Sequence, residues 1–330
     1  MFTKILAATN RPFDADPVVL AAARLAENLS ASLHILHALP APYIKGAFDF
    51  EPKDMPVPKP ESRTGEESRI RRSMEKIYAP LLPSKIQRTI RIVHGEAWQE
   101  ILTWAKTLKA NLIVMGPHDG NMKEQAGRRR KTDRVGSTVQ AVLRRERCPV
   151  SIVTASMAAH RMVFKRLLVA VDFSKSCECA VCFSVRAARH FRADVIIFHM
   201  IPVLPFPKYS QAEYRRDVVL SKQRVEAFCK DTMGDVLHHC EVWGGAMPYM
   251  EIVRCAELNQ ADAIIMGSHT KETGGKWYAG SAVERVAAIS RSPVMVITDP
   301  AVLTPWKRRV SSRQNDVEKG GRLIRVHAGG

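Results

Sequence analysis

Residues 261–286 read ADAIIMGSHTKETGGKWYAGSAVERV: a short apolar run, a glycine-rich stretch, and an amphipathic pattern that begins at Gly280-Ser281. The apolar run predicts a buried strand, and the pattern after Ser281 predicts a helix. Backbone N–H groups at a helix start favour phosphate, and glycine allows a ligand to approach closely. The segment is therefore typical of a phosphate-binding strand–loop–helix unit, but an ordinary turn with Ser281 as helix N-cap has the same pattern.

The same pattern occurs earlier in the chain. VGSTVQAVLRRERCPVSIVT at residues 135–154 aligns without a gap with AGSAVERVAAISRSPVMVIT at residues 279–298, and ANLIVMGPH at residues 110–118 aligns with ADAIIMGSH. Solenoid repeats span roughly 20–50 residues, so this longer period indicates the duplication of a whole domain. We expect a first domain at residues 1–155, a second at residues 156–300 and a basic tail at residues 301–330.

Each half alternates apolar runs with amphipathic patterns, which is typical of a parallel sheet with helices on both faces. We therefore expect an α/β fold with two flavodoxin-like (Rossmann-like) domains, each containing a five-stranded parallel sheet. Such sheets bind ligands beyond the carboxyl ends of the strands, here between the first and fourth strand of each half. A proline-rich insertion at residues 40–63 is expected to form a loop. Strands are expected near residues 4–9, 32–38, 86–93, 110–115 and 150–154, and near 166–171, 194–200, 238–243, 263–267 and 294–298.

The composition indicates a globular protein of the cytoplasm. The 330 residues are 46% hydrophobic and 25% charged, which is ordinary for soluble domains. No apolar run approaches the roughly 18–20 residues that a membrane-spanning helix needs, so we expect no membrane insertion. The seven cysteines lie mostly inside periodic segments and are expected to be reduced thiols.

The formal net charge of +17 raises the question of nucleic-acid binding. The excess charge is concentrated in the RRRK run at residues 128–131 and in the tail after residue 307. Such runs are usually solvated loops or tails, and no aromatic residues that could stack on bases accompany them. The sequence therefore disfavours a nucleic-acid partner.

The second half contains LLVAVDFS at residues 167–174, a glycine turn at Gly245, AIIMGSH at residues 263–269, GSAVERV at residues 280–286 and SPVMVIT at residues 292–298. Together these motifs resemble a universal stress protein domain. The resemblance covers nearly all of residues 155–300 and, more weakly, residues 1–154. It implies a tandem stress-response protein that binds an adenine nucleotide for signalling or protection, with two domains paired through their last strands as a pseudo-dimer.

In ATP-binding members of that family, the motif is a glycine, two residues, a second glycine, nine residues, and then Gly-Ser or Gly-Thr. Here Gly267, Thr270 and Gly280-Ser281 keep the spacing, and Asp172 keeps the acid that follows the first strand. Thr270 carries a Cβ atom where glycine would allow close approach, which weakens or abolishes binding. The ligand implied is ATP, ADP or AMP, with or without Mg²⁺. The resemblance places Asp172, Phe173, Met200 and Met266 near adenine and ribose, and Gly267, Gly280, Ser281 and Ala282 near the phosphates.

The first half departs further from this motif and is expected to hold a degenerate site. Asn10 replaces the acid, and Asp119 takes the position of the second glycine. The loop that follows is seven residues longer and contains the RRRK run, whose arginines are placed to reach an anion. The remaining positions of the degenerate site are Gly116, Gly136 and Ser137.

Two further patterns raise the question of catalysis or metal binding. His118 and His269 occupy equivalent positions after the fourth strands, but no nucleophile partners them, so an inherited structural role is favoured. Cys177, Cys179 and Cys182 lie at the start of a predicted helix, where the dipole can lower a thiol pKa. No second ligand pair completes a zinc spacing, so packing is favoured over metal binding. Trp277 lies in the glycine-rich loop, where it can cover a ligand or meet a partner.

The sequence thus favours an adenine nucleotide bound mainly in the second half, and any ATP hydrolysis would be slow. The alternative is a nucleotide-free scaffold of the same fold, whose basic insert and tail bind acidic partners. Pairing of the two halves within the chain is expected. The sequence leaves open a homodimer and an unknown protein partner.

Overall fold

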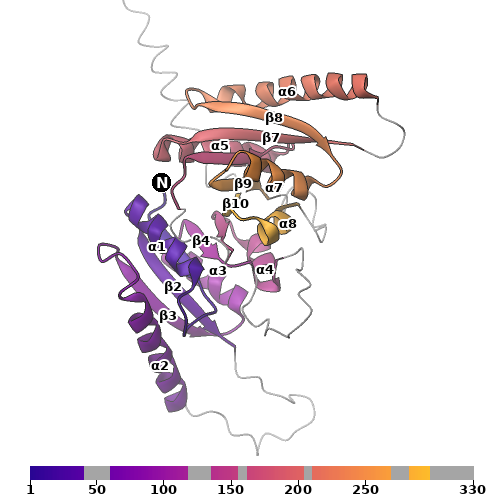
Figure 1. Cartoon of the computed structure of the whole chain (residues 1–330). Coiled ribbons are helices and arrows are strands. Elements are labelled where there is room, and N and C mark those ends of the chain that lie inside the picture. Colours follow the sequence, from indigo (N-terminus) through magenta and orange to yellow (C-terminus); the bar gives the residue numbers. More distant parts are fainter. Residues whose placement is uncertain (41–59, 118–134, 155–161, 204–209, 269–281, 298–330) are drawn as a thin grey trace, which may run out of the picture.

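The computed structural model describes residues 1–40, 60–117, 135–154, 162–203, 210–268 and 282–297, with the backbone alone for residues 60–64. A ten-stranded sheet runs through both halves in the order β3-β2-β1-β4-β5-β10-β9-β6-β7-β8 (Figure 1). Each half has the doubly wound order expected of a flavodoxin-like domain, with the winding reversed between its first and fourth strands. The strands are β1 (Lys4–Ala8), β2 (Ser32–Leu39), β3 (Arg88–His94), β4 (Leu112–Met115), β5 (Val150–Ile152), β6 (Arg166–Ala170), β7 (Asp194–Pro202), β8 (His238–Gly245), β9 (Ala263–Gly267) and β10 (Val294–Ile297).

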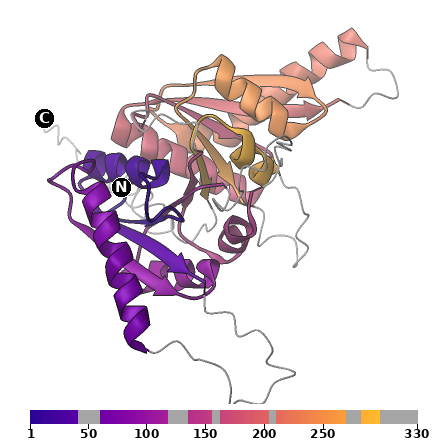
Figure 2. The same cartoon turned by 60° about the horizontal axis from the view of Figure 1, so that its bottom comes forward.

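Helices cover both faces of the sheet. One buried cluster joins the sheet to α1, α2, α5 and α6, and the other joins it to α3, α4, α7 and α8. The long helices α2 and α6 lie at opposite ends of the molecule, next to the outer strands β3 and β8 (Figures 1 and 2). The helices are α1 (Pro17–Leu29), α2 (Pro60–Tyr78), α3 (Ala97–Leu108), α4 (Ser137–Arg145), α5 (Lys175–Phe191), α6 (Gln211–Met233), α7 (Pro248–Leu258) and α8 (Ala282–Ile289).

The last strands of the two halves pair with each other. β5 and β10 run antiparallel, with Ser151 opposite Met295 and Val150 opposite Val296, whereas all other neighbouring strands in the sheet are parallel. The central position of this pair hides two strand edges inside the chain. The expected intramolecular pseudo-dimer is confirmed.

The contact between the halves extends beyond this pair of strands. Met162 and Phe164, just before β6, are each only 1% exposed. The Phe2 ring of the first half lies 5.8 Å from the Phe183 ring of α5. The cluster that contains these residues takes side chains from both halves, so the halves share one core.

The expected loop at residues 40–63 needs correction at its end. Residues 60–63, assigned to a proline-rich loop, form the start of α2, because proline is well suited to the first turn of a helix. The last helix, α8, ends at Ile289. Its end is set by Ser290, whose hydroxyl donates to the Ser292 carbonyl at 2.7 Å and accepts from the Ser292 N–H at 3.0 Å. Residues 41–59 of the insertion, and the tail, lie outside the described part.

Among the described residues, no helix is both long and apolar enough to cross a membrane.

Candidate functional site at the carboxyl edge of the second half

Asp172 follows β6 at the point where the winding of the second half reverses. Its side chain is exposed, and its Oδ1 atom accepts hydrogen bonds from the Ser174 N–H at 3.1 Å and the Ser174 hydroxyl at 2.7 Å. The Ser174 hydroxyl also accepts a bond from the Cys177 N–H at 3.2 Å and thereby caps α5. One serine therefore starts the helix and orients the carboxylate at the sheet edge, where a ligand hydroxyl can reach it.

Phe173 has a left-handed backbone, with φ of 66°, which is uncommon for a residue other than glycine. Its ring lies edge-on to Phe228 of α6 at 5.5 Å, and the Arg224 guanidinium lies 4.0 Å from the ring centre. The ring also meets His199 at 4.7 Å. The Phe173 side chain thus packs against α6, and only its backbone lies at the sheet edge.

A histidine that the motifs above do not include joins the strand ends in both halves. His199 Nδ1 of β7 donates to the Val171 carbonyl at 2.8 Å, and His37 Nδ1 of β2 donates to the Thr9 carbonyl at 2.9 Å. The alignment of residues 32–40 with residues 194–202, which ends in proline in both copies, pairs these two histidines and gave a signal for them. The imidazole fixes the backbone at the point where the first strand of each half ends.

Gly267 ends β9 and is placed by close packing against α5. A Cβ atom on Gly267 would lie 2.4 Å from the carbonyl carbon and oxygen of Ser176 and 2.7 Å from the Cys177 nitrogen. The first turn of α5 therefore crosses Gly267 too closely for any other residue. This requirement of the fold exists whether or not a phosphate binds nearby.

The other described residues of the second-half site have apolar surroundings. Met266 is 4% exposed and belongs to the core, while Met200 and Ala282 are half-buried and pack against the same cluster. Thr270, Gly280 and Ser281 lie outside the described residues, as do His269 and Trp277. The structure thus gathers Asp172, Met266 and Gly267 at one sheet edge, because their strands β6 and β9 are neighbours.

In the first half, Asn10 is exposed at the matching position, and the nearest buried acid serves the fold. Asp16 is 4% exposed and caps α1: its carboxylate accepts from the Val18 N–H at 2.9 Å and from the Thr9 hydroxyl at 2.5 Å. The Tyr78 hydroxyl of α2 accepts from the Asp16 N–H at 3.1 Å. Burial raises the pKa of Tyr78 to about 12. Asp16 is thus engaged by the fold.

The loop ends of the first-half site lie together. Gly136 caps α4, and its N–H donates to the Pro117 carbonyl at 2.7 Å. Gly116 precedes Pro117, and Ser137 is the first residue of α4. Gly136-Ser137 therefore opens a helix next to the end of β4, while His118, Asp119 and the RRRK run lie outside the described residues.

The three clustered cysteines of α5 are buried. Burial raises the pKa of Cys177 to about 12, the opposite of what its position at a helix start would give alone. Among the described residues, no group of three or more His, Cys, Asp or Glu side chains is placed to hold a metal ion. A protonated, buried thiol fits packing better than redox chemistry.

Three tryptophans of α3 and β8 pack on the face of the sheet that α3, α4, α7 and α8 cover. Arg145 lies 4.4 Å from the Trp98 ring centre and Arg91 lies 4.2 Å from that of Trp104. Trp243 Nε1 donates to Glu251 at 2.8 Å. These tryptophans are half-buried and cover the core.

The fold and this edge define a tandem of two doubly wound α/β domains. The sequence matches the universal stress protein family over residues 1–154 and again over residues 163–298. The chain therefore belongs to the universal stress protein family, with two domains in tandem.

Individual relatives agree with this assignment. Two universal stress proteins of Methanocaldococcus jannaschii are 27% identical over 146 residues (42% of this chain, 84% of the relative) and 29% identical over 156 residues (41% and 96%). A crystal structure of a universal stress protein from Archaeoglobus fulgidus has a TM-score of 0.59 at 19% identity, covering 90% of this chain and 96% of its own. A Pseudomonas aeruginosa protein of unknown function has a TM-score of 0.54 at 14% identity, covering 94% and 98%. Both structures share the fold across both halves.

Proposed function

We propose that this protein binds an adenine nucleotide, ATP, ADP or AMP, at the carboxyl edge of the second half, and that binding serves signalling or protection under stress. The observation that carries the proposal is the exposed Asp172 carboxylate, held by Ser174 at the point where the sheet reverses. Ligands of doubly wound sheets bind at this point, and a carboxylate there suits ribose hydroxyls. The spacing of Gly267, Thr270 and Gly280-Ser281 supports the phosphate side.

The first half is proposed to bind nucleotide weakly or not at all. Asn10 offers a neutral amide where the second half has a carboxylate, and hydrogen bonds to charged groups are the stronger ones. The two halves therefore provide a comparison within one chain, with Asn10 as the matched position for Asp172.

The proposal is tested by isothermal titration calorimetry with ATP, ADP and AMP on the purified full chain. Asp172→Asn keeps an acceptor for Ser174 and removes the charge, so we expect it to weaken binding by about tenfold or more, the loss of about 1.5 kcal/mol of a charged hydrogen bond. Asn10→Ala should leave the affinity within about twofold, a difference too small to represent a lost hydrogen bond. Denaturation of the protein as purified should release adenine nucleotide, detected by chromatography.

Two outcomes would contradict the proposal. Equal losses from the Asn10 and Asp172 changes would refute the difference between the halves. No released nucleotide together with no calorimetric signal would favour the nucleotide-free scaffold, in which the glycine-rich loops serve the fold and the basic segments bind acidic partners.

A further inference from the structure

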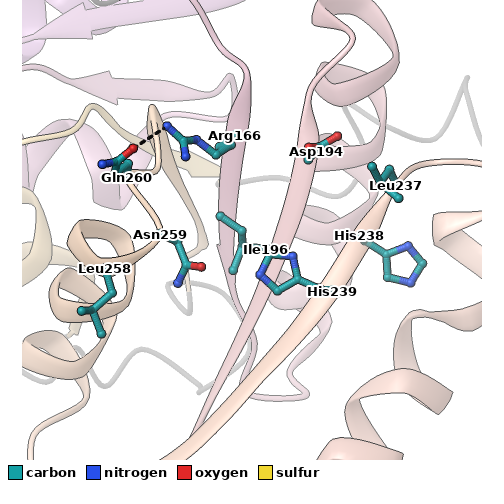
Figure 3. A pocket seen from close by; sticks show the side chains of 9 residues that line it. All are labelled: Arg166, Asp194, Ile196, Leu237, His238, His239, Leu258, Asn259 and Gln260. Carbon is teal, nitrogen blue, oxygen red and sulfur yellow. Dashed lines mark hydrogen bonds between the residues drawn. The ribbon is translucent and has the colours of Figure 1, made fainter.

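A groove of about 520 Å³ lies at the amino edge of the second half, at the opposite end of the strands from Asp172. It lies between the starts of β6, β7 and β8 and the end of α7 (Figure 3). The buried Ile196 lies between its two sides. Other side chains that line it include Arg166, Asp194, Leu237, Leu258 and Gln260.

The sides of the groove carry two unusually exposed leucines. Leu237 is 71% exposed and Leu258 is 67% exposed, the highest values among the exposed large hydrophobic side chains of the described residues. Figure 3 shows the two leucines on opposite sides of the groove. Interaction surfaces expose apolar side chains close together, and here the two most exposed leucines of the described residues line one groove.

The first half shows that the fold does not need these leucines. The Leu237 carbonyl accepts from the Val195 N–H at 3.0 Å, and the Gln87 carbonyl accepts from the Leu33 N–H at 2.9 Å, which makes Gln87 the counterpart of Leu237. The backbone makes the same hydrogen bond in both halves, but the side chain is the polar Gln87 in the first half and the exposed, apolar Leu237 in the second.

The same comparison holds at the end of the helix. Leu258 lies two residues before Gln260, which has a left-handed backbone with φ of 50°, and Thr107 lies two residues before Lys109, with φ of 51°. Thr107 is therefore the counterpart of Leu258. Because glutamine and threonine occupy these places in the first half, the fold itself does not need a leucine at either position.

The charges around the groove suit a copy of the same surface. Arg166 and Asp194 are both exposed, and Arg166 Nη2 donates to the Gln260 side-chain oxygen at 3.0 Å, which holds the guanidinium at the edge of the groove (Figure 3). A guanidinium and a carboxylate on one surface select neither an acidic nor a basic partner. In a twofold contact, Arg166 of each copy would face Asp194 of the other, because such contacts are reciprocal.

We propose that this groove is a dimerisation surface whose occupant is a second copy of the chain. Each copy inserts an exposed leucine into the groove of the other, and the Arg166 and Asp194 side chains pair across the twofold axis. Only the second half carries the leucines, so the contact closes as a dimer rather than extending as a filament. The last-strand pairing is already used inside the chain, between β5 and β10. We expect the contact to form a reversible dimer.

The first experiment is sedimentation velocity on the full chain over a concentration series that spans the micromolar range. We expect reversible dimerisation of the wild type. Leu237→Gln combined with Leu258→Thr installs the first-half residues, so it should keep the fold, checked by circular dichroism, and weaken dimerisation at least about tenfold. The matched control, Gln87→Ala with Thr107→Ala, should leave the dimer unchanged.

The second experiment tests the charge pairing by exchange. Arg166→Asp and Asp194→Arg should each weaken the dimer, and the double variant should restore it, which a merely local loss of structure would not do. A wild type that is monomeric at every concentration overturns the proposal. Dimerisation that survives the leucine changes, or a double charge variant that stays monomeric, overturns it equally.

Discussion

Gly267 lies where β9 ends beneath the first turn of α5, and its backbone does not have a positive φ. Space alone therefore determines what this position tolerates. A methyl group 2.4 Å from the Ser176 backbone cannot be accommodated by a side-chain rotation, so helix and strand must separate. We expect Gly267→Ala to lower the free energy of unfolding by about 1–3 kcal/mol, measured by urea denaturation without nucleotide.

The matched control is Gly65→Ala in α2, where an added Cβ meets no atom within 4 Å. Alanine is the better helix former, so this change should raise stability by about 0.5–1 kcal/mol. If Gly267→Ala were as well tolerated as Gly65→Ala, the packing role would be refuted. Because Gly267 is needed by the fold, loss of nucleotide binding in its variants cannot identify a ligand contact, and Asp172 is the better probe.

His37 of β2, which contacts the end of β1, makes the stability of the folded protein depend on pH. His37 is 6% exposed, and burial lowers its pKa below the ordinary 6.5, although its bond to the Thr9 carbonyl acts in the opposite direction. As the pH falls through 6.5, the unfolded chain takes up a proton that the folded chain binds only at lower pH. The contribution of the neutral ring to stability is therefore complete above pH 6.5 and is lost as the pH falls through the lower folded pKa.

We expect the difference in melting temperature between the wild type and His37→Gln to narrow as the pH is lowered from about 8 to about 5. Differential scanning fluorimetry on both proteins across this range measures it. His34 and His190 also have lowered pKa values and contribute to the slope of both proteins, so only the difference reports on His37. A difference that does not change with pH would show that the His37 proton is not coupled to folding.

The sequence predicts the bounds of a strand well where the whole strand is buried. β9 has the predicted bounds, residues 263–267, because a strand buried on both faces forms a continuous apolar run. The proline-rich pattern predicts a loop at Pro60, whereas Pro60 starts α2, because the role of a proline at a helix start depends on the residues that follow. The direction of the Phe173 ring depends on Arg224 and Phe228 of α6, far along the chain, so no local pattern predicts it.

In the whole molecule, the two halves form one continuous structure and not two independent domains. The sheet is continuous through β5 and β10, and both buried clusters contain side chains from both halves. On the side that faces the other half, β5 pairs with β10 and β10 pairs with β5. Each half therefore completes the sheet edge of the other. The duplicated domains should therefore unfold in one cooperative step.

A buried charge at the seam tests this cooperativity. Val296 is 0% exposed and lies opposite Val150, so Val296→Asp buries an unpaired carboxylate between the halves and should cost about 3–5 kcal/mol. Hydrogen exchange measured by mass spectrometry should then show lost protection in β1 and β4 of the first half as well as in β9. Val219→Asp, on a side chain that is 56% exposed in α6, is the matched control and should change little. Protection retained in β1 and β4 of the Val296 variant would show instead that each half keeps its structure alone. A cooperative unit cannot lose stability on only one side of the β5–β10 pair.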